Sequence, residues 1–115
     1  MRMRKEETMT QVARIKIPAR VRKGEAFRVR TKVSHPMETG WRKDGHGEVV
    51  PRNRIHSFAC TFNGQPVFRS DFHSEVSADP YLSFFARIEE SGTLEFIWID
   101  DAGTKLRRTA EIEAV

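Results

Sequence analysis

The residues with the clearest chemical potential in this chain are four histidines and a single cysteine. Imidazole and thiolate groups are ligands that iron and zinc prefer, so a metal site is the first hypothesis. Cys60, however, alternates with Phe58 and Phe62, which indicates the core-facing side of a strand. His56 falls at the outer end of that same face, and His73 comes just after a strand. A thiol in such apolar surroundings has a raised pKa and is neither a ready ligand nor a nucleophile.

The same residue count occurs at the iron site of superoxide reductases, which are immunoglobulin-like sandwiches. Those sites draw a cysteine and a histidine from one short C-x-x-H segment, whereas Cys60 is followed by Thr61, Phe62 and Asn63. We therefore expect no metal and no cofactor, and an iron enzyme stays only as an alternative that metal analysis and a visible absorption spectrum would reveal. The chain also lacks a G-x-S-x-G motif, and its acidic residues fall mainly in turns, so we expect no catalytic residues and no enzyme activity.

The net charge of +4 and the pI of about 9.6 suggest a nucleic-acid partner. Many lysines and arginines nevertheless alternate with apolar residues, as they do on the solvated face of a strand. The basic pattern is therefore too diffuse, and we expect no nucleic-acid partner. No apolar run approaches the ~20 residues of a membrane-spanning helix, so we expect no membrane segment either.

The N-terminal segment MRMRKEETMTQ carries positive charge but has no apolar centre and no small-residue cleavage site. It does not fit a signal peptide, and we expect a flexible polar tail over residues 1–11. The remaining residues, 12–115, have the length of one small domain with a core of its own.

Alternation with a period of two dominates this domain. The run FRVRTKV at 27–33 alternates apolar and polar residues without interruption, as a half-buried strand does. Asn63–Gly64 is a strong hairpin signal, because a two-residue I′ turn needs a positive φ at both positions. About seven short antiparallel strands with turn signals between them predict an all-β, immunoglobulin-like sandwich. The other strands are expected at 13–17, 56–62, 65–72, 82–88, 94–99 and 105–113.

The expected strand at 94–99 is apolar on both faces. Leu94, Phe96 and Trp98 suit the core, which leaves Ile97 and Ile99 on the outer face, where a small sandwich should be wet. Two explanations stay open. Either a loop of the chain, such as the long one at 34–52, covers these isoleucines, or they belong to a protein–protein interface, for which exposed apolar surface is the usual mark.

The segment SHPMETGWRKDGHGEVVPR at 34–52 interrupts the alternation. A connection of about 20 residues exceeds the usual length, and such loops tend to be functional. Pro36 and Pro51 would stiffen its two ends by fixing φ. We regard the segment as a candidate contact loop for a partner or for a partner's flexible arm, and its candidate contact residues are His35, Met37, Arg42, Lys43 and Arg52.

From about Val12 to its C-terminus the chain resembles the SoxZ family. Several separate motifs in register carry the resemblance, which makes it more specific than any one of them. The motifs are SHPMETG at 34–40, RKD at 42–44, VPR at 50–52, FACTFNG at 58–64, PVF at 66–68, SADPY at 77–81, EESGT at 89–93 and WIDDAG at 98–103.

The resemblance implies the smaller, non-catalytic subunit of the SoxYZ sulfur carrier of bacterial thiosulfate oxidation. In that family the subunit is an immunoglobulin-like sandwich that forms a heterodimer with SoxY, itself a sandwich. SoxY carries sulfur intermediates on a cysteine at the end of a glycine-rich C-terminal arm, which visits the other Sox pathway enzymes. The present sequence shows no Gly-Gly-Cys arm, so Cys60 is not expected to be the carrier cysteine.

The resemblance also implies a periplasmic location, because SoxZ is exported together with SoxY and needs no signal peptide of its own. The SoxY interface is expected around Ile97 and Ile99. An uncovered apolar face favours homodimers when the chain is expressed alone. A free-standing sandwich that acts as an interaction module stays the alternative, and a neighbouring gene for a SoxY-like chain would decide between the two.

Overall fold

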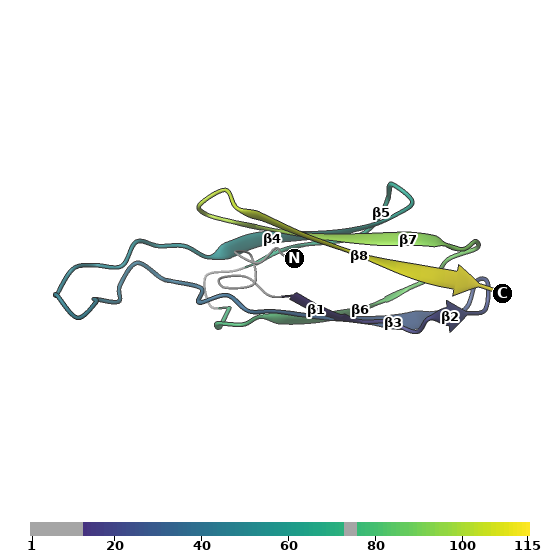
Figure 1. Cartoon of the computed structure of the whole chain (residues 1–115), viewed down its shortest axis with the longest axis horizontal. Helices are drawn as coiled ribbons and strands as arrows, with labels where there is room; N and C mark the ends of the chain where they lie inside the picture. The colour runs from purple at the N-terminus through teal and green to yellow at the C-terminus, as the bar shows by residue number, and fades with distance from the viewer. Residues whose placement is uncertain (1–12, 73–75) are drawn as a thin grey trace, which may run out of the picture.

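The computed structural model describes residues 13–72 and 76–115, so the tail expected at residues 1–11 and His73 lie outside the described part. In the described residues eight strands form two sheets stacked as layers (Figure 1), which confirms the predicted all-β, immunoglobulin-like sandwich. One sheet has the order β1 (Ala13–Lys16), β3 (Phe27–Val33), β6 (Tyr81–Ala86). The other has the order β2 (Arg20–Val21), β8 (Lys105–Ala114), β7 (Gly92–Asp100), β4 (Ile55–Phe62), β5 (Gln65–Asp71).

The chain changes sheets between β1 and β2. β1 pairs antiparallel with β3, whereas the two-residue β2 pairs parallel with β8 in the opposite layer. Pro18 lies at the crossing, where a residue without an N–H group interrupts a ladder at little cost. The predicted antiparallel arrangement missed this short parallel pair, because a two-residue strand leaves no alternation to detect. No helix in the described residues is long and apolar enough to cross a membrane.

The core lies between the layers and is built by the predicted alternation. Every second residue of β3 and β7 is buried, and Phe58 of β4 is fully inaccessible. The Phe58 ring centroid lies 5.1 Å from that of Trp98 in its own sheet and 6.1 Å from that of Phe84 in the opposite sheet. Aromatic contacts of this kind add to the free energy of burial and stabilise the packing of one sheet against the other.

Strand β4 begins with an irregularity that the sequence did not reveal. Its pairing with β7 shifts register between Ile55 and Ser57, so Ile55 takes the core position and His56 is exposed. The prediction that His56 shares the face of Phe58 was therefore wrong, because a bulge adds one residue and turns the next side chain to the other face. At the other end of β4, Asn63 and Gly64 have φ values of 47° and 84°, which confirms the predicted hairpin turn.

Candidate functional site

The segment 34–52, called the projecting loop below, extends beyond one end of the sandwich, between β3 and β4 (Figure 1). Its two limbs are joined by backbone hydrogen bonds. Glu38 and Asn53 bond reciprocally, with N···O distances of 2.8 and 3.0 Å, and farther out the Val50 N–H donates to the Arg42 carbonyl at 2.8 Å. The loop is thus a two-limbed ribbon that continues the line of the adjoining strands.

A buried pair of polar side chains holds the base of the loop. His35 Nε2 lies 3.3 Å from Asp100 Oδ2, and both side chains are only 2% exposed. The Met37 N–H donates to His35 Nδ1 at 2.9 Å, so the ring proton is on Nε2, which donates to the carboxylate. The second Asp100 oxygen accepts from the Thr104 N–H at 2.9 Å. The imidazole therefore connects the first limb of the loop to the turn between β7 and β8.

Met37 is the second buried residue of this base. Its φ of 53° lies in the left-handed region, which a residue with a Cβ occupies at a cost of about 1–3 kcal/mol. The side chain is nonetheless well placed, because it is 4% exposed and its Sδ accepts a hydrogen bond from the Ile55 N–H at 3.3 Å. His35 and Met37 were predicted as contact residues, but the structure places both in the interior, where they position the loop.

The second limb is held by the same β7–β8 turn. The backbone N–H of Asp101 donates to the Arg54 carbonyl at 2.9 Å. The Asp101 side-chain oxygen Oδ2 accepts from the Arg54 N–H at 3.1 Å and lies 3.3 Å from Arg52 Nε. Asn53 Oδ1 accepts from the Ala102 N–H at 3.3 Å. The sequence placed the acidic residues mainly in turns, and in the structure the two turn aspartates, Asp100 and Asp101, also hold both limbs of the loop.

The three predicted contact cations of the loop are all exposed, but they differ in their partners. Arg42 Nε and Nη2 lie 3.0 and 2.8 Å from the two carboxylate oxygens of Glu38. This hydrogen bonding lowers the pKa of Glu38 and raises that of Arg42. Arg52 faces Asp101, as described above, whereas Lys43 takes part in none of the ion pairs found in residues 13–72 and 76–115.

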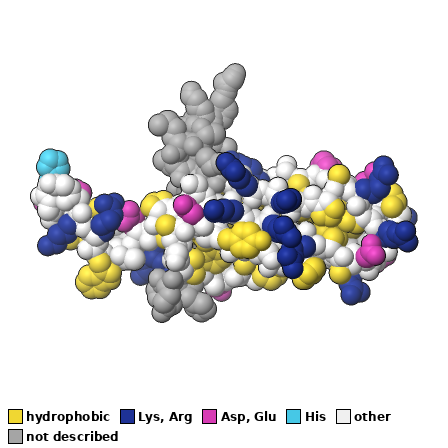
Figure 2. All heavy atoms as spheres, turned by 90° about the horizontal axis from the view of Figure 1, so that it is seen from below, with side chains coloured by type: hydrophobic (Ala, Val, Ile, Leu, Met, Phe, Trp, Pro, Cys, Tyr) yellow, Lys and Arg dark blue, Asp and Glu magenta, His cyan; other side chains and the backbone are white. Residues whose placement is uncertain are grey.

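Two exposed apolar side chains on the loop were missed by the sequence reasoning. Trp41 is 86% exposed and Val49 is 55% exposed. Figure 2 shows hydrophobic side chains at this projecting end, outside the body of the sandwich. A signal was available, because an aromatic residue between glycine and charged residues in a long loop has no strand face on which to be buried. Exposed tryptophan is uncommon on surfaces without a binding role and is enriched at interface hot spots.

Ile97 and Ile99 lie on the outer face of the five-stranded sheet, as predicted, and both are half-buried. On β4 they oppose Ala59 and Ser57. Because these two side chains are small, the isoleucine side chains project beyond them on the outer face. The projecting loop leaves the end of the sandwich and does not cover them (Figure 1). Their partners on β8 are basic, namely Arg107 and Lys105. The outer face thus has an apolar strip, Ala59, Ile97 and Ile99, with cations along one side.

The cysteine and the three histidines within residues 13–72 and 76–115 lie apart from one another. His35 is buried at the loop base, His46 is exposed near the loop tip, and His56 is exposed on β4. Cys60 is buried in the core, where burial raises the pKa of its thiol to about 12. Within the part of the chain that the structure describes, no three His, Cys, Asp or Glu side chains form a group that could hold a metal ion.

We expect Cys60 to resist alkylation in the folded protein. With a pKa near 12 and a buried sulfur, its reaction with iodoacetamide at pH 8 should be at least about 100-fold slower than in 8 M urea. Mass spectrometry over time would measure both rates. Equal rates in the folded and unfolded protein would contradict a buried thiol.

The raised pKa also predicts how stability depends on pH. The unfolded thiol titrates near its ordinary value of 9.0 and the folded one near 12, so the unfolded state loses the proton first as pH rises. The free energy of unfolding should therefore decrease between these two pH values. The variant Cys60→Ala serves as the control, since its stability should fall less steeply over the same interval.

Comparisons with known proteins support one family and a wider fold group. A family model described as "Sulphur oxidation protein SoxZ" matches residues 15–111. Curated proteins gave no match. Among solved structures, superoxide reductase (neelaredoxin) from Ignicoccus hospitalis aligns with a TM-score of 0.72 and 18% identity, covering 96% of this chain and 88% of that one. The sulfur carrier protein SoxY from Chlorobium limicola aligns with a TM-score of 0.61 and 16% identity over 90% and 78%. At such identities these two structures establish the fold alone.

Proposed function

The chain belongs to the SoxZ family of sulfur-oxidation proteins, and from this we propose that it is the non-catalytic subunit of a SoxYZ carrier. In this proposal a SoxY partner holds the sulfur intermediates on a cysteine at the end of its flexible arm. The present chain provides a rigid body against which SoxY docks and part of the wall that shelters the reactive adduct. We place the heterodimer in the periplasm, reached by export together with SoxY.

The observation that carries the proposal is the apolar strip of Ala59, Ile97 and Ile99 on the outer face of the five-stranded sheet, which the projecting loop does not cover. An apolar side chain that moves from water into an interface contributes about 25 cal/mol for each Å² that is buried. The strip lies on a five-stranded sheet, and a second sandwich can pack a sheet against it at about 10 Å. A solved SoxY has the sandwich fold that such packing requires.

The chemistry of the side chains supports a non-catalytic role. The thiol of Cys60 is held in its protonated form, deep in the core, and is unsuited to carry a sulfur adduct. The buried imidazole of His35 already uses both ring nitrogens, one toward Asp100 and one toward Met37. The buried cysteine is thus committed to packing, and the buried histidine to holding the projecting loop.

We assign the projecting loop to contact with the same partner. It is anchored at both limbs, yet its outer part presents Trp41 and Val49 to solvent. A rigid ribbon with an exposed aromatic side chain costs little conformational entropy when it binds, which favours its use as an anchor. Of the loop cations, Lys43 is the one that no acid of the described residues neutralises, and it is suited to steering an acidic partner or an anionic adduct.

The test is the double variant Ile97→Asp/Ile99→Asp, co-expressed with SoxY. Two carboxylates taken out of water in an interface cost several kcal/mol even with Arg107 and Lys105 opposite them, so we expect co-purification to be lost. The matched control is Tyr81→Asp/Phe85→Asp, which places the same charges on outward positions of the other sheet. Circular dichroism and melting curves of both variants establish that they fold.

An intact heterodimer of the folded Ile97/Ile99 variant would overturn the proposed interface. If charge at these positions also prevents folding, Ile97→Ser/Ile99→Ser gives a milder change. That variant should lower the affinity for SoxY by about tenfold or more, from the apolar area that it removes. Wild-type affinity in the folded serine variant would equally count against the interface.

A further inference from the structure

The outer face of the three-stranded sheet gathers a large group of positive charges. Strands β1, β3 and β6 alternate buried and exposed residues, so one set of side chains points away from the core. We call this set the basic face. Figure 2, which views the molecule from the side of this sheet, shows lysine and arginine side chains gathered over its middle. The basic face consists of Arg14, Lys16, Arg28, Arg30 and Lys32 together with the aromatic residues Tyr81 and Phe85.

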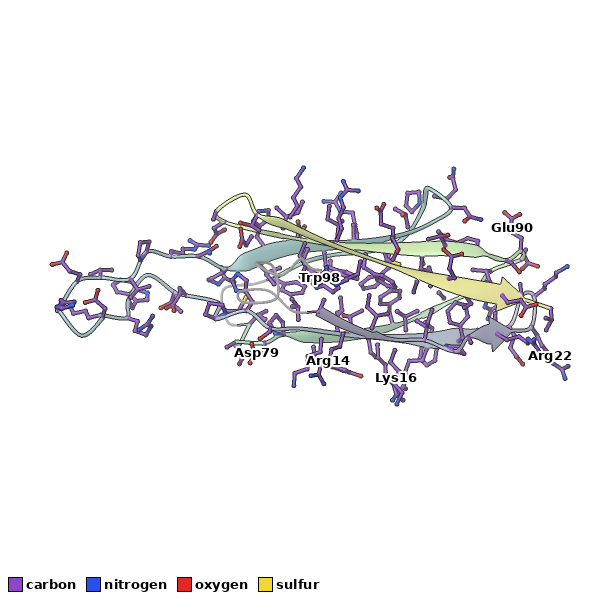
Figure 3. The ribbon with its side chains drawn as sticks, in the orientation of Figure 1. Arg14, Lys16, Arg22, Asp79, Glu90 and Trp98 are labelled. Carbon is purple, nitrogen blue, oxygen red and sulfur yellow. The ribbon has the colours of Figure 1, made fainter. Side chains whose placement is uncertain are left out.

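The strand register places these cations directly opposite one another. Arg14 of β1 opposes Lys32 of β3, and Lys16 of β1 opposes Arg30 of β3. Like charges at such positions destabilise a sheet. Figure 3 shows Arg14 and Lys16 pointing away from the sandwich. The repulsion between these cations thus lowers the stability of the sheet, and the fold itself does not require cations at these positions.

Among the described residues, no acid forms an ion pair with any of the five cations of the basic face. Arg28 lies over the ring of Phe85, with its guanidinium carbon 5.2 Å from the ring centroid. The carboxylate of Asp79, at the edge of the face beside Arg14 and Lys32, already accepts a hydrogen bond from the His35 N–H at 2.9 Å.

The basic face is also hollowed, so acidic side chains can enter it. A depression of about 280 Å³ lies among Arg14, Lys16, Arg30, Lys32 and Tyr81. A second, of about 310 Å³, lies farther along the same strands and is lined by Lys16, Ile17, Pro18, Arg28 and Arg30. Neighbouring strands are about 4.8 Å apart, close to the 5–6 Å between the Cβ atoms of residues three or four apart on a helix. The spacing of the cations thus matches that of an acidic helix face.

The aromatic residues favour a protein over a nucleic acid. Single-stranded nucleic acids bind sheets by stacking bases on exposed rings. Arg28 occupies one face of the Phe85 ring, so a base could stack on that face only by displacing the guanidinium. A carboxylate can instead bind Arg28 in place. Tyr81, which is 60% exposed, adds the kind of side chain that protein interfaces prefer, and arginine is enriched there as well.

We propose that the basic face is a docking surface for an acidic protein partner, separate from the apolar strip on the opposite sheet. The two sheets face away from each other, so partners could occupy both at once (Figure 1). The charge and register that support this proposal do not depend on which protein covers Ile97 and Ile99. An intact heterodimer in the SoxY experiment would therefore not count against the docking surface on the basic face. Failure of the peptide experiment below would likewise not count against the SoxY interface.

The experiment measures binding of a fluorescent helical peptide with glutamates at i, i+3 and i+4 to the full chain and to Arg30→Glu/Lys32→Glu. Both substitutions lie on the central strand, opposite Lys16 and Arg14. We expect the affinity for the peptide to fall at least about tenfold, and the affinity of the unchanged protein to fall with added salt. The melting temperature should hold or rise, because the new glutamates oppose cations.

The matched control is Arg22→Glu/Lys23→Glu, which makes the same change in net charge in an exposed turn away from the basic face. It should retain the affinity for the peptide. Equal losses in the two double variants would overturn the proposal, because the effect would then come from net charge alone. So would the absence of any peptide binding.

Competing occupants are tested with a 20-base-pair DNA, a 20-nucleotide single strand and vesicles of 30% phosphatidylglycerol in phosphatidylcholine. The affinity of the full chain and of the same two double variants for each of these ligands is measured at 150 mM salt. Tighter binding of either DNA or of the vesicles than of the peptide, lost in Arg30→Glu/Lys32→Glu, would assign the face to nucleic acid or membrane and overturn the proposal.

Discussion

Replacement of His35 by alanine is expected to lower the free energy of unfolding by about 3 kcal/mol, because buried hydrogen bonds to a carboxylate and to a backbone amide are lost together. The Asp100 carboxylate is 2% exposed and would lose the imidazole N–H that now lies 3.3 Å from it. The Met37 amide would lose its acceptor at the same time. Urea denaturation of the isolated chain gives the change directly.

The matched control is His46→Ala, at an exposed position near the loop tip, which should change stability by less than about 0.5 kcal/mol. His35→Asn tests the two bonds separately, since its shorter side chain can still accept from the Met37 amide but does not extend to Asp100. We expect it to recover part of the loss. If His35→Ala were no more costly than His46→Ala, the buried pair would not hold the loop base.

The role of His35 shows what a sequence conceals about a site. The residue was prominent in the sequence, first as a metal ligand and then as a contact residue, yet its function depends on a partner 65 positions away. Asp100 was expected only as one of the acidic residues in turns, so nothing in the sequence marked it as the partner of His35. The pairing of β4 with β7 brings the end of the loop beside the β7–β8 turn, and the stacking of the two sheets brings its start there from β3. Neither arrangement is visible in a short window of sequence.

The layers of the fold were more predictable than the irregularities within it. Period-two alternation in β3 and β7 is set by burial of one sheet face, so each strand can be recognised on its own. The bulge that exposes His56 and the parallel pair formed by β2 depend instead on the neighbouring strand. Such features are decided by tertiary contacts and have no signature within a short window of sequence.

The basic face illustrates the same limit for charge. Strands β1 and β3 were correctly predicted to have a solvated face rich in lysine and arginine, and the pattern was judged diffuse for that reason. In the structure, β1 pairs with β3 so that Arg14 opposes Lys32, and charges that are separate in sequence become one surface. Charge density depends on strand order and register, which composition does not contain.

Replacement of Trp41 by alanine is expected to weaken binding to SoxY by about 30-fold, or about 2 kcal/mol, the typical effect of removing an aromatic hot spot. Trp41 is 86% exposed and its side chain supports no part of the core, so stability should change by less than about 0.5 kcal/mol. Titration calorimetry with purified SoxY measures the affinity, and melting curves measure stability. Loss of affinity without loss of stability identifies a contact residue.

Two variants separate this role from general surface effects. Tyr81→Ala removes another well-exposed aromatic side chain, but from the outer face of the three-stranded sheet, and should leave the affinity for SoxY unchanged. Lys43→Gln should reduce the association rate at low salt and have little effect at high salt, because an exposed charge steers the encounter. Wild-type affinity in Trp41→Ala would remove the loop tip from the SoxY interface, and the apolar strip of Ile97 and Ile99 would then have to supply the binding energy without it.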